Sequence, residues 1–274
     1  MGALIDIDAY FRRIGYQGDG EPTLDTLREL VLRHTAAIPF ENLDPLLGRP
    51  VRLDPASLEA KLVRGGRGGY CYEQNLLFRH ALEGLGFRVE GLAARVLWNA
   101  PEDAVTPLTH MMLKVDLGEG SYLADVGFGA QSPTAPLRLE PDVEQATPHE
   151  PYRLLRRGGD LMLQCLIRDA WKPLYRFDLR ACPDIDYEVG NWYVSTHPGS
   201  HFVTGLMAGR AAPGLRYAML NNELAVHRLG EGTERRVLAD AAAVREALEG
   251  PLGLTLPDDA RLAECLARLA AGPG

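Results

Sequence analysis

Cysteine is scarce in this chain of 274 residues: there are only four, and no two of them form a CxxC pair. Cysteines so widely scattered in a chain of this length make a poor disulfide framework and a poor zinc site. We therefore expect no metal site and a reducing, cytoplasmic location. Cys165, Cys182 and Cys265 have sequence surroundings typical of packed or inert side chains.

Long apolar runs and basic blocks are also missing. No uninterrupted apolar stretch reaches membrane-spanning length, and the first residues lack the basic and then apolar pattern of a secretory signal. The net charge is −8, and no long basic block offsets it, which argues against a general nucleic-acid binder. We expect neither a membrane nor a nucleic acid as a partner. The charge pattern is compatible with a monomer or a homodimer.

The patterning that is present changes along the chain. The first 87 residues have helical patterning, with Thr23 and Asp54 in positions typical of helix N-caps. Glycine-containing turns separate strand-like segments at 110–117 and 121–128 and again at 152–157 and 161–168, as in hairpins. Strand patterning covers 201–229, and the tail is helical again. This order predicts an α+β fold of two or three subdomains rather than a doubly wound parallel sheet.

Cys71 has an unusual position in this pattern. It follows Gly68, Gly69 and Tyr70 and directly precedes a stretch with helical spacing, for which Gly86 is a plausible end. A sulfur at a helix start lies near unpaired N–H groups and the positive end of the helix dipole, and both favour the nucleophilic thiolate. The alternative is a buried cysteine that merely precedes an ordinary helix.

Two further residues make Cys71 a candidate nucleophile. His110 opens one strand of the first hairpin, and Asp125 lies among apolar residues of the other, where an unpartnered carboxylate would be costly to bury. Because the hairpin makes these strands neighbours, Asp125 can orient the imidazole, which can then exchange a proton with Cys71. Each residue could instead be a satisfied polar group. From the residues alone, a cysteine acyl-transfer site and a hydrolase site both remain open.

The sequence resembles the arylamine N-acetyltransferase family, of bacterial type. The segments that carry this resemblance are 38–45, 67–75, 109–110, 125–129 and 195–198, and the similarity continues to about residue 228. The resemblance implies three parts: a helical bundle over 1–87 that carries the nucleophile, a β-barrel over 88–190 that carries the histidine and aspartate, and an interdomain segment with an α/β lid over 191–274. It also implies a cysteine-protease-like catalytic triad of Cys71, His110 and Asp125.

The resemblance assigns roles to further residues. The backbone N–H of Tyr72 is the expected oxyanion donor, and Glu41 and Arg67 are expected to form a buried ion pair beside the cysteine loop. Phe40, Phe128 and Phe202 match aromatic positions around the acceptor. The positions expected to contact coenzyme A are Trp98, Thr109, Gly129 and His227.

The implied activity is ping-pong transfer of an acetyl group from acetyl-CoA, through an acetyl-cysteine, to the nitrogen of an arylamine or arylhydrazine. Acetyl-CoA would be a co-substrate, and no cofactor would be bound permanently. Two alternatives use the same residues: an amide synthase that releases a polyketide by macrolactam formation, and a cysteine amidase or peptidase with water as acceptor. A non-catalytic binding protein would not need the complete triad.

Overall fold

The structure of the protein is a computed structural model that describes residues 5–272. Its N-terminal part is helical, and Thr23 and Asp54 each accept a hydrogen bond from a backbone N–H in the first turn of the helix that follows. The elements of this part are α1 (Ile7–Ile14), α2 (Leu24–Ala37), the short strand β1 (Phe40–Glu41), α3 (Leu43–Leu46), α4 (Pro55–Leu58), the π-helical turn η1 (Glu59–Arg64) and α5 (Cys71–Gly84).

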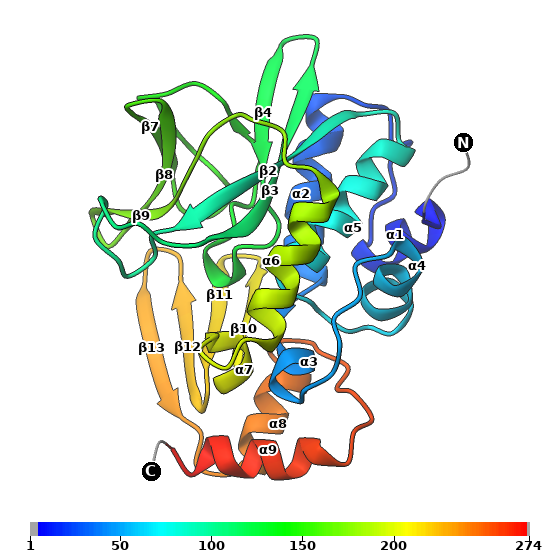
Figure 1. The fold of residues 1–274 in the computed structure, drawn as a ribbon, viewed down its shortest axis with the longest axis vertical. Helices are drawn as coiled ribbons and strands as arrows, with labels where there is room; N and C mark the ends of the chain where they lie inside the picture. The colour runs from blue at the N-terminus through cyan, green and yellow to red at the C-terminus, as the bar shows by residue number, and fades with distance from the viewer. Residues whose placement is uncertain (1–4, 273–274) are drawn as a thin grey trace.

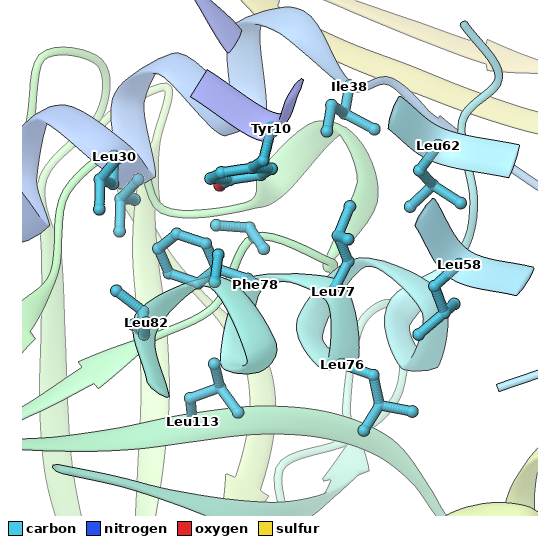
Figure 2. Close-up of a cluster of buried hydrophobic side chains, with 14 of the residues drawn as sticks. Tyr10, Leu30, Ile38, Leu58, Leu62, Leu76, Leu77, Phe78, Leu82 and Leu113 are labelled. Carbon is cyan, nitrogen blue, oxygen red and sulfur yellow. The ribbon is translucent and has the colours of Figure 1, made fainter. Parts of the chain in front are cut away.

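The helix α5 is the centre of the N-terminal core. Its buried side chains Leu77 and Phe78 face Tyr10 of α1 and its neighbours, while Leu113 of strand β3 (Leu108–Leu117) lies on the other side of the helix (Figure 2). Each large apolar side chain buried in this way contributes about 1.5–3 kcal/mol. Packing on both sides therefore fixes the start of α5 relative to the strands.

An eight-stranded antiparallel sheet forms a nearly closed barrel beside these helices (Figure 1). Its edge strands are β5 (Leu137–Arg138) and β6 (Glu144–Gln145). The Gln145 side chain bridges them by accepting from the N–H of Arg138 at 2.7 Å and donating to its carbonyl at 2.9 Å. In sheet order the strands are β5 (Leu137–Arg138), β4 (Gly120–Ala124), β3, β2 (Arg88–Val96), β9 (Ala170–Phe177), β8 (Asp160–Ile167), β7 (Tyr152–Arg157) and β6 (Glu144–Gln145).

The barrel confirms the predicted hairpins with one correction. The strand predicted over 121–128 ends at Ala124. Asp125 therefore lies just beyond the strand, where its own carboxylate accepts from the N–H of Gly127 at 2.9 Å and turns the chain. A side chain that bonds the backbone two residues ahead favours a turn over a strand ladder.

The C-terminal part is a second sheet with helices on one face. Its order is β1, β10 (Met207–Ala212), β11 (Leu215–Leu220), β12 (Glu223–Arg228) and β13 (Gly232–Val237), so a strand from the N-terminal part completes it. Helices α8 (Ala241–Glu249) and α9 (Arg261–Ala270) share an apolar core with this sheet and lie at the bottom of Figure 1. The strand pattern predicted from residue 201 is wrong at its start, where α7 (His201–Thr204) forms.

The connection between barrel and C-terminal sheet is the helix α6 (Asp184–Thr196), which the sequence patterning did not predict. It buries Tyr187 and Val194 in the N-terminal core and leaves its opposite face exposed. No helix within residues 5–272 has the length and apolar character that crossing a membrane requires.

Candidate active site

Cys71 is the first residue of α5 and is almost completely buried. The Glu73 carboxylate accepts from the backbone N–H of Tyr70 at 3.2 Å and so caps this helix. The N–H groups of Cys71 and Tyr72 belong to the first turn, whose donors have no partner inside the helix. The Cys71 sulfur lies 3.7 Å from the carbonyl oxygen of Thr109, the residue before His110.

His110 and Asp125 form a buried pair beside this sulfur. His110 Nε2 lies 2.7 Å from Asp125 Oδ2, and both side chains are at most 3% exposed. Burial alone would lower the pKa of His110, but the Asp125 carboxylate and the neighbouring Cys71 sulfur outweigh it and raise the pKa to about 10. At neutral pH the ring is therefore a cation held between an acid and a sulfur.

The Asp125 carboxylate remains ionised although it is buried. Burial raises its pKa, but the charge of His110 and hydrogen bonds from His110, Gly127 and Asn75 together hold the pKa below its usual range. Asn75 Nδ2 donates to Asp125 Oδ1 at 3.0 Å, and Asn75 Oδ1 accepts from the N–H of Val126 at 3.1 Å. Asn75 is one helical turn after Cys71, so α5 carries both the sulfur and the residue that fixes the acid.

Gly127 allows this close approach. A Cβ at this position would lie 2.8 Å from Cys71 Cα and 2.6 Å from Asn75 Nδ2, closer than any real side chain permits. The segment after Asp125 therefore packs directly on the first turn of α5.

The residues expected to contact the arylamine acceptor form two adjoining aromatic groups, one beside Tyr70 and one beside His110. Phe40 and Phe202 contact each other with ring centroids 6.1 Å apart, and Tyr70 contacts Phe202 at 5.4 Å. Phe128 packs edge-on against His110 at 5.0 Å. A Cβ on Gly129 would lie 3.7 Å from the Phe40 ring, so the two groups of aromatic residues adjoin each other.

The four residues expected to contact coenzyme A are more dispersed. Thr109 and Gly129 lie beside Cys71 and Phe40, respectively. Trp98 packs against the barrel core, as Phe128 does. His227 lies on β12 of the C-terminal sheet, where its Nδ1 is 2.9 Å from the Thr233 hydroxyl.

A buried charge network lies beneath the cysteine loop. The expected pair is confirmed: Arg67 Nη2 donates to Glu41 Oε1 at 2.7 Å. Lys61 Nζ lies 2.7 Å from Asp44 and 2.6 Å from Glu73, so two cations face three carboxylates. Burial raises the pKa of Glu73 to about 7, although Lys61 opposes this shift. The network joins α3, η1 and the start of α5.

Sequence reasoning missed two residues at the site. Asn75 stands in the segment already singled out, four positions after Cys71, and this spacing is a signal that could have identified it. Tyr175 packs against His110 at 4.9 Å and against Phe128 at 5.1 Å, and its hydroxyl is buried near Asp125. Nothing local in the strand β9 distinguishes Tyr175 from a core residue.

A cysteine at a helix start, an imidazolium and an orienting carboxylate are the groups that acyl transfer through a thioester requires. Residues 23–261 match a family described as N-acetyltransferase. An arylamine N-acetyltransferase of Mycobacterium tuberculosis is 49% identical over 275 residues, which cover 96% of this chain and 97% of that protein. The chain therefore belongs to the arylamine N-acetyltransferase family.

Solved structures agree with this assignment. An arylamine N-acetyltransferase of Mycobacterium marinum superposes with a TM-score of 0.93 at 49% identity, covering 97% of this chain and all of that one. The same enzyme in complex with CoA gives a TM-score of 0.93 and covers 96% of this chain and 99% of that one. These similarities favour the acetyltransferase over the amide synthase and the amidase or peptidase.

Proposed function

We propose that this protein transfers an acetyl group from acetyl-CoA to the nitrogen of an arylamine or arylhydrazine, through a thioester on Cys71. The observation that carries the proposal is the buried contact of 2.7 Å between His110 and Asp125 beside the sulfur of Cys71.

The four cysteines are unpaired, which fits a reducing cytoplasm.

In the first half-reaction, the Cys71 thiolate attacks the thioester carbonyl of acetyl-CoA. The N–H of Tyr72, in the first turn of α5, stabilises the charge that develops on the carbonyl oxygen. The carbon–sulfur bond to coenzyme A breaks, the leaving thiolate takes the proton from His110, and acetyl-Cys71 remains. One thioester replaces another, so little free energy separates the two states.

In the second half-reaction, the neutral amine nitrogen attacks acetyl-Cys71. Its surplus proton passes to His110, the bond from carbon to Cys71 breaks, and the thiolate–imidazolium pair is restored. Asp125 holds the ring so that Nδ1 is the nitrogen that exchanges protons with substrate and sulfur. Phe40, Phe128 and Phe202 would contact the aromatic part of the acceptor, and Trp98, Thr109, Gly129 and His227 would contact the donor.

The test is to mix the protein with acetyl-CoA alone, follow the free thiol and weigh the intact protein. We expect about one equivalent of coenzyme A to be released and one acetyl group to be gained at Cys71, with neither event in Cys71→Ala. Cys165→Ala is the matched control, because that thiol is buried in the barrel core. Cleavage of amides without release of coenzyme A would indicate a hydrolase instead. No acetyl adduct on the wild-type protein would refute the proposal.

A further inference from the structure

Arg216 on β11 is an arginine buried to 97% and surrounded by acceptors from the barrel side of the molecule. Its Nε donates to Glu150 Oε2 at 2.7 Å, and its Nη1 donates to the carbonyls of Ala130 at 2.9 Å and Ser132 at 3.0 Å. A buried guanidinium with so many partners fixes their geometry, because any displaced partner would leave an unsatisfied buried group.

Tyr152 extends this contact. Arg216 Nη2 donates to the Tyr152 hydroxyl at 3.2 Å, and that hydroxyl donates to the carbonyl of Gln131 at 3.0 Å. Three successive carbonyls, those of Ala130, Gln131 and Ser132, therefore depend on Arg216 and Tyr152. The neighbouring strand β10 also packs closely on this segment: a Cβ at Gly209 would lie 2.7 Å from the N atom of Ala130.

The segment from Asp125 to Ser132 is thus held by two separate anchors. In its first half, Asp125 and Val126 are hydrogen-bonded to Asn75 of α5. Its second half, which begins with Phe128 and Gly129, is bonded to Arg216 of the C-terminal sheet. The first anchor fixes the catalytic carboxylate, and the second fixes residues expected to face the substrates.

Arg216 also lies next to His227, a residue expected to contact the acetyl donor. The two residues are direct cross-strand partners on β11 and β12. Glu150 lies between them, with one carboxylate oxygen on Arg216 and the other 3.7 Å from His227 Nε2. The buried Arg216–Glu150 ion pair therefore links the segment directly after Gly129, through the Ala130 and Ser132 carbonyls, to His227 on the C-terminal sheet.

We propose that Arg216, together with Glu150, is a positioning residue for the acetyl donor: it fixes Gly129 and His227 relative to each other without touching the reacting atoms. This inference rests on the proposed function, in which these two residues contact acetyl-CoA. A small acetyl donor that lacks the nucleotide does not need this alignment, because Asn75 holds the catalytic carboxylate independently.

The experiment compares two donors in Arg216→Lys: acetyl-CoA and 4-nitrophenyl acetate, an aryl ester without a nucleotide. We expect kcat/KM for acetyl-CoA to fall by about ten- to a hundred-fold, mainly through KM, since a misplaced binding group can cost about a hundred-fold. Acetylation of Cys71 by the ester should fall by no more than about three-fold, because the two anchors are separate.

Three variants make the result interpretable. Arg210→Lys is the matched control, because Arg210 lies on neighbouring β10 and donates to the carbonyl of Ala36, away from this segment. Asn75→Ala should slow both donors alike. Glu150→Gln keeps the shape of the contact and removes its charge, and it should reproduce the donor-selective loss in weaker form, which decides the question if Arg216→Lys does not fold.

Equal losses with both donors in Arg216→Lys and Glu150→Gln, or no loss with either, would overturn the proposal. A wild-type protein that acetyl-CoA does not acetylate would instead refute the proposed function itself.

Discussion

Replacing Asp125 by asparagine tests the central pair of the site. Asp125 Oδ1 accepts from both Asn75 and Gly127, so the amide oxygen of the variant has to occupy that side. The amide NH₂ then faces His110 Nε2 and can only donate to it. His110 must accept there, which places its one remaining proton on Nδ1. The ring can no longer take a proton at Nδ1.

The size of the effect follows from the charge that is lost. Burial lowers the pKa of His110, but the Asp125 carboxylate contributes most to the opposite effect, and the net result is a rise from 6.5 to about 10. At about 1.4 kcal/mol for each tenfold change in proton affinity, this corresponds to about 5 kcal/mol of stabilisation of the charged ring. Losing most of it should slow acetylation roughly 10³- to 10⁴-fold.

The assay is the rate of acetylation of Cys71 by acetyl-CoA, together with alkylation of Cys71 by iodoacetamide between pH 5 and 9. Because the pKa of His110 is raised to about 10, the ring stays charged throughout this range, so the wild-type sulfur should be alkylated faster than an ordinary thiol on the acidic side of neutrality. In Asp125→Asn, the ring is neutral and reaction should rise only toward the pH of an ordinary thiol, about 8.5.

The control is Asp116→Asn, on the same hairpin but with Ser121 and Lys114 as partners. Its alkylation profile should match that of the wild type. If Asp125→Asn also keeps the wild-type profile and rate, the reasoning about charge and tautomer is wrong.

Three further predictions concern other parts of the site. In the wild type at pH 6, alkylation at Cys71 should be much faster than at Cys165, because burial raises the pKa of Cys165 to about 12. Mapping the adducts by mass spectrometry measures both rates, and equal rates would contradict this prediction. Phe202→Ala removes ring contacts with Phe40 and Tyr70, so it should raise KM for arylamines several-fold more than it slows acetylation by acetyl-CoA. An unchanged preference among acceptors would show that the Phe202 side chain only packs and does not select the acceptor. Glu41→Gln removes the negative charge beside Arg67 and leaves a single acceptor oxygen for Arg67 and the N–H of Leu43, so it should lower the free energy of unfolding by about 3–5 kcal/mol in urea titration. Glu29→Gln, in an exposed pair, should change it by less than about 1 kcal/mol.

Much of the local structure was readable in the sequence. Thr23 and Asp54 act as the predicted N-caps, and Cys71 stands at the predicted helix start, because capping and turn formation depend on residues within one turn of each other. The two hairpins follow from glycine turns between alternating segments. The same hairpin logic brought His110 and Asp125 close together, and the motifs around them identified the family.

Only the tertiary structure decided how these pieces are held. Asp125 leaves the strand after Ala124, and Asn75 on α5 fixes it there. Arg216 reaches across 84 to 86 positions of sequence to the carbonyls of Ser132 and Ala130. Such contacts carry no local pattern, because they depend on which surfaces meet once helices, barrel and C-terminal sheet have packed. The sequence thus determined the reacting groups, and packing determined their alignment.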